Sequence, residues 1–257
     1  MIPVLVCGAA GRMGGHVLRA VAASTSLRVA AALEHEGHAL VGEEIHPGIK
    51  LGDSVEDALQ GVQLAIDFSL PEGTLRLTEA AARRGVALVI GTTGLSAEQR
   101  GRIEAAARGI PILLAPNFSL GVNVLLELVA EAARRLEGYE IEILELHHSR
   151  KLDAPSGTAL ALARAAAGAR GLELDAHAVY HREGHTGPRP PEAIGLQSLR
   201  AGDSIGEHSV YLAGPGERLE LSHRALSRDS FAAGAVRAAS WLAGRPPGLY
   251  SMQDCLG

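Results

Sequence analysis

The first half of the chain alternates short, almost wholly apolar runs with longer stretches in which apolar and polar residues recur at helical spacing. Apolar runs of this kind are typical of strands that are buried on both faces of a parallel sheet. We therefore predict strands at Val4–Cys7, Leu27–Leu33, Leu64–Asp67, Ala87–Ile90 and Ile112–Leu114, and helices at Arg12–Ala23, Thr74–Arg84 and Ala97–Ala107. Strands that alternate with helices in this way predict an α/β domain with a doubly wound parallel sheet.

The pattern changes after residue 119 and indicates a second domain of a different kind. The predicted elements there are helices at Val122–Leu136 and Ala159–Ala167, and strands at Ile141–His148, His208–Leu212 and Arg218–His223. A last predicted helix at Phe231–Leu242 is expected to pack back on the first domain. Glycines and a proline at 214–216 predict a hairpin between the last two strands. We expect residues 120–228 to form an α+β domain on a mixed or antiparallel sheet, and residues 1–119 with 229–257 to form the first domain.

Composition and charge narrow the class of protein. Of the 257 residues, 47% are hydrophobic and 21% are charged, as in ordinary globular proteins. The net charge of −5, without a run of Lys or Arg, argues against a nucleic-acid partner, and no apolar stretch is long enough to span a membrane. Cys7 lies in an apolar run and Cys255 near the end of the chain, so we predict no disulfide framework and expect a cytoplasmic protein.

A glycine-rich segment joins the first predicted strand to the first predicted helix. It reads Gly8-Ala9-Ala10-Gly11-Arg12-Met13-Gly14. Glycines at such a turn let the backbone approach a pyrophosphate, which the free N–H groups of the helix start would bind. Glu34 ends the second predicted strand, 20 residues after Gly14, where an acidic side chain would bind ribose hydroxyls. Either feature alone also fits a tight turn or a solvated carboxylate, but together they predict a site for NADH or NADPH.

The segment from His147 to Lys151 holds the densest group of side chains that can transfer protons. It is followed by Ser156-Gly157-Thr158 at a predicted helix start, where Ser156 is a suitable N-cap and the next N–H groups would bind a carboxylate. We predict no metal site, because neighbouring strand residues point to opposite faces and no further spaced ligand completes the histidine pair. Lys151 also fits a solvated loop lysine, and Ser156 a cap alone. Proton donors next to an anion site nonetheless favour an active site.

These segments resemble the dihydrodipicolinate reductase family, the 4-hydroxy-tetrahydrodipicolinate reductases of lysine and diaminopimelate biosynthesis, over nearly the whole chain. The most specific match is residues 145–159, which fit the family's E-x-H-H-x-x-K-x-D-A-P-S-G-T-A. Further matches are the glycine-rich segment, Asp67-Phe68-Ser69, Gly91-Thr92-Thr93-Gly94, residues 116–123, and Arg200-Ala201-Gly202-Asp203 with Gly206-Glu207-His208.

The resemblance implies hydride transfer from NADH or NADPH to (2S,4S)-4-hydroxy-2,3,4,5-tetrahydrodipicolinate. It implies that His147 is the general acid/base and Lys151 the proton donor, and that both face the nicotinamide across a pocket. The implied substrate-binding residues are His148, Ser156, Gly157 and Thr158, and the implied cofactor-binding residues are Gly8, Ala9, Ala10, Gly11, Arg12, Met13, Glu34, Gly91, Thr92, Thr93, Ala115, Pro116, Asn117 and Phe118. It also implies a Rossmann-type first domain and a second domain that builds a homotetramer.

Two departures from the family bear on the cofactor. His35 follows the ribose-binding acid where some relatives carry an arginine that grips the phosphate of NADPH, and Gly15 takes another basic position. With Arg12 as the remaining cation, we expect NADH to work at least as well as NADPH. Two alternatives stay open: another nicotinamide-dependent oxidoreductase acting on a small carboxylate, and a non-catalytic dinucleotide-sensing protein. A semialdehyde dehydrogenase is disfavoured, because it needs a nucleophilic cysteine in its active site and Cys7 lies in a predicted strand.

Overall fold

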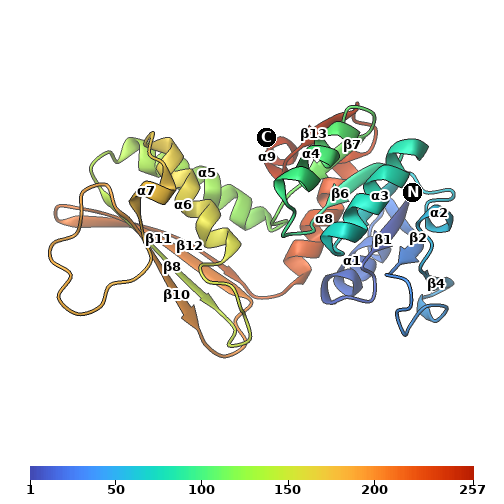
Figure 1. The fold of residues 1–257 in the computed structure, drawn as a ribbon, viewed down its shortest axis with the longest axis horizontal. Helices are drawn as coiled ribbons and strands as arrows, with labels where there is room; N and C mark the ends of the chain where they lie inside the picture. The colour runs from blue at the N-terminus through green and yellow to red at the C-terminus, as the bar shows by residue number, and fades with distance from the viewer. The chain divides into compact units, whose positions relative to one another are not determined.

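The computed structural model describes residues 1–257. The chain folds into two compact units, one formed by Met1–Leu120 together with Arg228–Gly257 and the other by Gly121–Ser227. Each unit is built on a single large sheet with helices packed against it (Figure 1). None of the helices combines the length and the apolar character that crossing a bilayer requires.

The first unit contains an eight-stranded sheet in the order β13-β7-β6-β5-β1-β2-β4-β3. Its strands are β1 (Ile2–Cys7), β2 (Leu27–Leu33), β3 (Glu44–His46), β4 (Ile49–Gly52), β5 (Leu64–Asp67), β6 (Ala87–Ile90), β7 (Pro111–Leu114) and β13 (Gly248–Tyr250). All neighbouring pairs are parallel except β3 with β4, so the predicted doubly wound sheet is confirmed. The sequence does not predict β3, β4 and β13, because strands of three or four residues at the margins of a sheet are too short to show a pattern.

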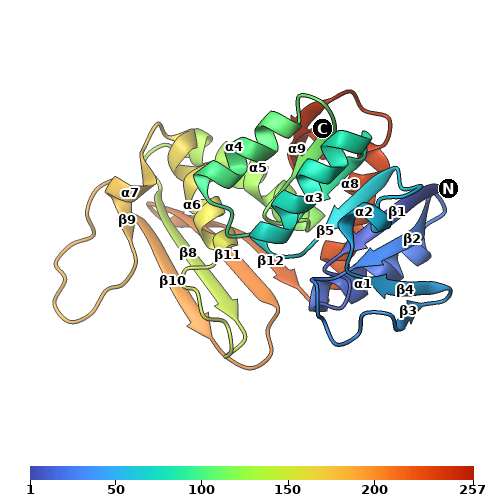
Figure 2. The same ribbon diagram turned by 45° about the vertical axis from the view of Figure 1, so that its right-hand side comes forward.

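Helices cover both faces of this sheet, which therefore has two separate hydrophobic cores (Figure 2). α1 (Arg12–Ala22), α8 (Asp229–Leu242) and α9 (Met252–Leu256) pack on one face, and α2 (Val55–Ala58), α3 (Pro71–Arg84) and α4 (Ala97–Ala106) on the other. Along β1, Val4 and Val6 enter the first core, whereas Leu5 and Cys7 enter the second. A strand covered on both faces has no position left for a polar residue, which explains its continuous apolar run.

The order of the strands reverses at β1, because β2 lies on one side of it and β5 on the other. At such a reversal the connections leave in opposite directions and open a crevice at the carboxyl ends of the strands. Cys7, the last residue of β1, pairs with Asp67, the last residue of β5. The glycine-rich segment and the Phe68-Ser69 segment therefore leave the sheet side by side.

The second unit contains a five-stranded mixed sheet in the order β12-β11-β8-β10-β9. Its elements are α5 (Leu120–Arg135, whose first residue belongs to the first unit), β8 (Glu140–His147), α6 (Gly157–Ala169), α7 (Leu174–His177), β9 (Ala178–Val179), β10 (Ile194–Arg200), β11 (Gly206–Gly214) and β12 (Glu217–Ala225). β10 runs parallel to β8, whereas β11 runs antiparallel to β8 and β12, so the predicted α+β unit with a mixed sheet is confirmed. The sequence does not predict β10, because Gln197, Ser198 and Arg200 interrupt its apolar pattern.

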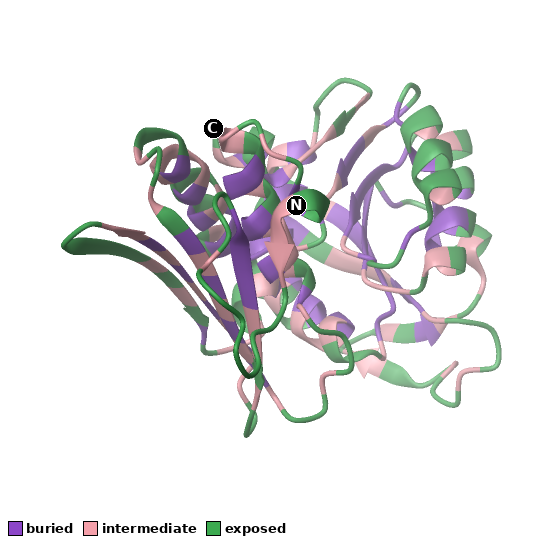
Figure 3. Cartoon of the chain, turned by 60° about the vertical axis from the view of Figure 1, so that its left-hand side comes forward, coloured by how far each residue is buried: buried purple, intermediate pink, exposed green.

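Residues along β8 alternate between a covered and a more open face of this sheet. In the chain as a whole, exposed residues are concentrated in the loops and on the outer sides of the helices (Figure 3). Ile141 and Ile143 are buried in a core to which α5 and α6 also contribute. The next two residues with the same orientation, Glu145 and His147, are buried as well. The strand thus carries a carboxylate and an imidazole onto the covered face of the sheet, at the end where the apolar core stops.

Candidate active site

A cavity of about 440 Å³ lies in the first unit. It is lined by the loops that follow β1, β5, β6 and β7, by the first turn of α1 and by one residue of α8. The lining residues are Gly11, Arg12, Met13, Phe68, Ser69, Gly91, Thr92, Thr93, Pro116, Asn117, Phe118 and Phe231. Nine of these twelve are residues that the resemblance assigns to cofactor binding. The fold therefore brings together four loops that are far apart in the sequence.

Five of the residues predicted to bind a cofactor lie outside this lining: Gly8, Ala9, Ala10, Glu34 and Ala115. Ala9 and Ala115 are buried in the hydrophobic core. Gly8 and Ala10 belong to the turn after β1, and Glu34 lies beside that turn. Gly8, Ala9, Ala10 and Glu34 thus belong to the glycine-rich segment or lie beside it, whereas Ala115 is a core residue after β7.

Three lining residues have no predicted role: Phe68, Ser69 and Phe231. Phe68 and Ser69 follow β5, so their position directly after a buried parallel strand is the sequence signal that identifies them. Phe231 belongs to α8, far along the chain, and no local pattern connects it with the glycine-rich segment.

The glycine-rich segment leaves the start of α1 open to a ligand. Gly11 is the N-cap of α1 and no side chain caps the helix, so the N–H groups of its first turn keep their capacity to donate. Gly8 has a φ of 68°, and a Cβ at Gly14 would lie 2.1 Å from the carbonyl oxygen of Gly8. This tight turn therefore requires glycine, and an open helix start beside the cavity fits the pyrophosphate of a dinucleotide.

Glu34 is held next to this segment. Its Oε2 accepts a hydrogen bond from the backbone N–H of Ala10 at 3.3 Å, and its Oε1 lies 3.2 and 3.1 Å from the backbone nitrogen and Nδ1 of His35. The Glu34 side chain is 14% exposed, whereas that of His35 is 61% exposed. A carboxylate in this place is suited to a ribose hydroxyl, with an exposed imidazole beside it.

A fully buried carboxylate ties together the loops after β5 and β6. Asp67 accepts hydrogen bonds from Thr74 Oγ1 at 2.5 Å, from Thr92 Oγ1 at 3.1 Å and from the backbone N–H of Ser69 at 3.1 Å. Burial raises the pKa of Asp67, and these hydrogen bonds offset part of that rise. Because Ser69 and Thr92 both line the cavity, Asp67 fixes the shape of its wall.

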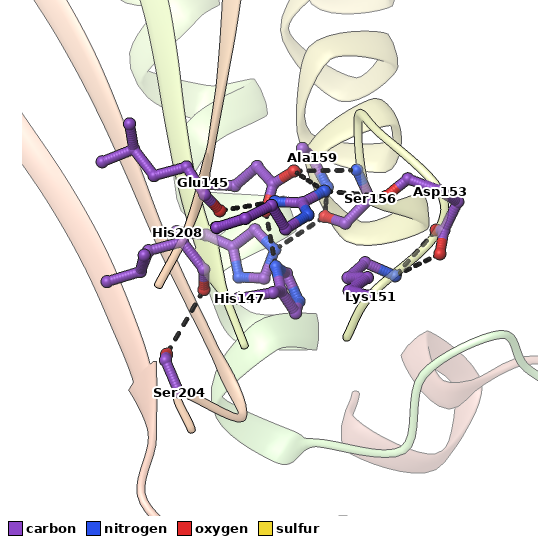
Figure 4. Close-up of polar contacts among 11 residues, drawn as sticks. Glu145, His147, Lys151, Asp153, Ser156, Ala159, Ser204 and His208 are labelled. Atoms are coloured by element: carbon purple, nitrogen blue, oxygen red, sulfur yellow. Dashed lines mark hydrogen bonds and ion pairs between the residues drawn. The ribbon is translucent and has the colours of Figure 1, made fainter. Parts of the chain in front are cut away.

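In the second unit, polar side chains gather around Glu145 near the end of β8 (Figure 4). Nδ1 of His147 lies 2.5 Å from Glu145 Oε2, and Arg200 donates to both carboxylate oxygens at 2.8 and 2.9 Å. Burial alone would raise the pKa of Glu145, but the hydrogen bonds from His147 and Arg200 lower it to about 2. The carboxylate is therefore ionised at neutral pH.

The start of α6 lies next to this cluster. Ser156 is its N-cap: Oγ accepts from the backbone N–H of Ala159 at 3.2 Å, and the backbone N–H of Ser156 donates to Glu145 Oε1 at 3.2 Å. Gly157 is exposed and Thr158 is half-buried in the first turn. His148 follows β8 and donates its backbone N–H to the carbonyl of Ser204 at 2.8 Å. The first turn of α6 thus lies close to the end of β8. An anion that is bound by the N–H groups of this helix start would therefore lie beside the cluster around Glu145.

Lys151 forms an ion pair within its own loop (Figure 4). Its Nζ lies 2.7 Å from each carboxylate oxygen of Asp153, and this contact lowers the pKa of Asp153. The Lys151 side chain is 19% exposed and that of Asp153 is 63% exposed. The structure thus gives Lys151 a partner that the sequence does not predict, and an incoming anion has to compete with Asp153 for the ammonium group.

His208 is a buried base within the same cluster. Its Nε2 lies 3.0 Å from Ser156 Oγ, its Nδ1 has no partner, and its ring packs edge-on against His147 with 5.2 Å between the ring centroids. Burial, with a smaller contribution from the charge of His147, lowers the pKa of His208 to about 4. In the unfolded chain the same group titrates near its ordinary value of 6.5.

We expect the folding stability to fall as the pH drops from 6.5 towards 4, and part of this fall to disappear in the variant His208→Gln. Between these pH values only the unfolded chain binds the proton, so stability rises with pH there and levels off above the unfolded pKa. Between pH values above the unfolded pKa and below the folded pKa, His208 lowers the free energy of unfolding by about 3 kcal/mol in total. Urea unfolding across this pH range measures it. His185→Gln, in an exposed loop, should keep the wild-type pH dependence, whereas an unchanged dependence in His208→Gln would contradict the assignment.

Both units match the models of a known protein family. The family model "Dihydrodipicolinate reductase, N-terminus" matches residues 2–118, and "Dihydrodipicolinate reductase, C-terminus" matches residues 121–256. The chain is 48% identical over 265 residues to the 4-hydroxy-tetrahydrodipicolinate reductase of Syntrophotalea carbinolica, with 100% of this chain and 99% of the relative covered. It is 52% identical over 265 residues to the protein of the same name from an Anaeromyxobacter species, with 100% and 98% covered.

Solved structures show the same fold. A dipicolinate-bound dihydrodipicolinate reductase from Paenisporosarcina sp. TG-14 superposes with a TM-score of 0.80 at 24% sequence identity, covering 98% of this chain and 97% of that one. This likeness concerns the arrangement of the elements in both units.

Proposed function

The chain belongs to the dihydrodipicolinate reductase family, and we propose that it reduces (2S,4S)-4-hydroxy-2,3,4,5-tetrahydrodipicolinate to 2,3,4,5-tetrahydrodipicolinate with NADH or NADPH, in lysine and diaminopimelate biosynthesis. Relatives that carry this activity in their name match the chain over its full length. The observation that carries the proposal is the cluster at the end of β8, where His147 lies beside the start of α6 and the Lys151 loop joins the two. The free cysteines agree with a cytoplasmic enzyme.

We propose that the two carboxylates of the substrate bind around the first turn of α6. The residues assigned to this task are His148, Ser156, Gly157 and Thr158. The N–H groups of a helix start donate to a carboxylate and the helix dipole favours its charge. The solved relative binds dipicolinate, a flat ring with two carboxylates, and we expect the same compound to bind here as an unreactive analogue.

We propose that the first unit binds the dinucleotide. The glycine-rich segment from Gly8 to Met13 would hold the pyrophosphate, Glu34 the ribose, and Gly91–Thr93 with Ala115–Phe118 the nicotinamide end. A bound nicotinamide supplies the hydride. The uncapped start of α1 and the cavity beside it support this assignment, and buried Ala9 and Ala115 would act through the shape of the backbone rather than through their side chains.

The residues of the second unit then have to manage protons. Loss of water from the substrate gives a conjugated ring imine; once hydride has added to ring carbon C4, electrons move toward the imine nitrogen and a proton must follow. We assign this proton to Lys151, whose ammonium group also attracts the dianionic substrate once it exchanges Asp153 for a substrate carboxylate. We assign general acid/base work to His147, because Glu145 occupies its Nδ1 and the other ring nitrogen, Nε2, is then the one that can exchange a proton with the substrate.

Replacing Glu34 by alanine should weaken NADH binding by about tenfold or more, because a charge-assisted hydrogen bond to the ribose is lost. NADPH should lose less, since its ribose phosphate has no use for a neighbouring carboxylate. Fluorescence titration with both dinucleotides measures this. Glu36→Ala, at an exposed site two residues further on, serves as the matched control and should bind both normally. Equal losses for NADH and NADPH would exclude contact with the ribose.

We propose a homotetramer that is built through the second unit, as the family resemblance implies. On the face of the sheet opposite to the helix-covered core, Leu146 and Leu199 are register neighbours and remain partly exposed. Apolar side chains on an open sheet face are typical of a surface that another subunit covers.

The proposed function is tested with the purified chain and freshly prepared substrate. Oxidation of NADH and of NADPH is followed side by side by their absorbance. A reductase of this kind consumes dinucleotide only when the cyclic substrate is present. A different oxidoreductase would respond to another small carboxylate instead, and a dinucleotide-sensing protein would bind NADH without consuming it.

A further inference from the structure

Glu145 occupies a place on β8 that otherwise suits an apolar residue. Ile141 and Ile143, which precede it with the same orientation, are buried in the hydrophobic core, and Glu145 itself is 1% exposed. A buried carboxylate has to be fully paired to be tolerated, and a well-packed apolar residue is often no less stable at such a position. Stability of the sheet alone therefore does not explain a carboxylate at this position. The explanation has to come from the contacts that Glu145 makes.

Both oxygens of Glu145 are used. Oε1 accepts from Arg200 Nη2 at 2.8 Å and from the backbone N–H of Ser156 at 3.2 Å. Oε2 accepts from Arg200 Nη1 at 2.9 Å and lies 2.5 Å from His147 Nδ1. Arg200 Nη2 also donates to the carbonyl oxygen of Asp153 at 2.7 Å. The ion pair thus contacts His147, the residue before α6 and the loop that carries Lys151.

The contact with Glu145 determines how His147 presents its ring. An ionised carboxylate at Nδ1 keeps a proton on that nitrogen, so the neutral ring offers the lone pair of Nε2, and the same carboxylate stabilises the ring when it is protonated. A Cβ at Gly206 would lie 2.9 Å from Nε2, so glycine leaves the ring the space it needs. His208 packs edge-on against the ring. The imidazole is thereby held in one orientation.

We propose that Glu145 and Arg200 form a positioning pair for the active site. Glu145 holds His147 as the Nδ1-protonated tautomer with Nε2 free, and Arg200 ties the Lys151 loop to the carboxylate that anchors the start of α6. The inference rests on the proposed function, because it takes His147, Lys151 and α6 to act on one substrate. Neither member of the pair needs to contact that substrate.

The first test is the variant Glu145→Gln. An amide of the same size can donate to Nδ1 and so favours the other tautomer of His147. We expect kcat to fall by about 100-fold or more and the limb of the pH–rate profile that reports His147 to move. NADH binding, measured by fluorescence titration, should be retained because the dinucleotide site lies in the other unit. Glu142→Gln is the matched control: it lies on the same strand, paired with Arg182 and Arg189, and should keep wild-type kcat and pH profile.

A second variant distinguishes a loss of activity from a loss of folding. Glu145→Gln leaves Arg200 without its counter-charge, whereas the double variant Glu145→Gln with Arg200→Gln removes both charges together. We expect the same loss of kcat from it. A folded variant of either kind with the kcat and pH profile of the wild type would overturn the proposal. Failure of both to fold would overturn it as well, since the pair would then be structural.

The tautomer of His147 separates this inference from the proposed function. The nitrogen-15 shifts of labelled histidines report it without turnover, and we expect Nδ1–H in the wild type and a changed tautomer in Glu145→Gln. A wild-type chain that shows this switch but does not reduce the substrate would refute the proposed function alone. If the wild type is active but Glu145→Gln changes neither the tautomer of His147 nor kcat, the positioning pair alone is refuted.

Discussion

Replacing Lys151 by alanine should lower kcat by about 100- to 10,000-fold while NADH binding stays near the wild-type level. Lys151 is one of only two lysines in the chain, although Lys and Arg together number 24. An ammonium group can release a proton, whereas a guanidinium effectively cannot, so arginine would serve charge attraction but not proton donation. Without Lys151 the reaction would lose both roles that we propose for it, the proton donor and a cation that attracts the substrate carboxylates.

Two further variants separate these roles in steady-state kinetics. Lys151→Arg keeps the charge and should restore much of the substrate affinity but little of kcat. Lys50→Ala, which removes the other lysine from β4 in the first unit, is the control and should turn over normally. If Lys151→Ala itself turned over within about threefold of wild type, Lys151 would have no part in the chemistry.

Replacing Gly14 by alanine should weaken NADH binding by about 100-fold, the upper end of what forced overpacking costs. A Cβ at this position would lie 2.1 Å from the carbonyl oxygen of Gly8 and 2.6 Å from the Cα of Ala9. Both are backbone atoms, so the turn between β1 and α1 has to open. Opening displaces the N–H groups that would hold the pyrophosphate.

The neighbouring glycine provides the matched control. A Cβ at Gly15 meets only the end of the Arg19 side chain, at 3.7 Å. Gly15→Ala should therefore bind NADH normally and raise the free energy of unfolding by about 0.5–1 kcal/mol, because alanine is the better helix former. Fluorescence titration and urea unfolding of the two variants give both quantities. Equal NADH affinities for Gly14→Ala and Gly15→Ala would contradict the assigned role of the turn.

The parts of the fold that are predictable from sequence are those whose burial leaves a mark on the local pattern. β1 faces a core on each side and consists of apolar residues throughout, so it is recognisable without further context. β10 carries Ser198 and Arg200 at its far end because both contact the buried Glu145, and these polar residues interrupt the apolar pattern of the strand. The short marginal strands are fixed by pairing with their neighbours, which no local pattern records.

The same distinction holds for the candidate site. His147, Lys151 and Ser156 stand close together in the sequence, so their grouping is predictable from spacing and from the family motif. Glu145 and Asp153, which pair with His147 and Lys151, lie in the same stretch of sequence. The residues that complete the cluster come from elsewhere: Arg200 from β10, which binds Glu145, and His208 from β11, which contacts Ser156. Their contacts depend on the register of three strands, in which Glu145 lies opposite His208 and His147 opposite Arg200. Register across a mixed sheet is a tertiary property, so the sequence shows these residues without showing what they contact.

Hydride transfer itself is tested most directly with NADH that carries deuterium at C4 of the nicotinamide. The purified chain is incubated with each of the two stereoisomeric labelled forms and fresh substrate, and the product is analysed by mass spectrometry. We predict that one form, and only one, delivers its deuterium to the ring of 2,3,4,5-tetrahydrodipicolinate, and that Lys151→Ala does so far more slowly. Product that forms without the label from either form, or dinucleotide that is bound but never consumed, would contradict the assignment of this chain as a reductase.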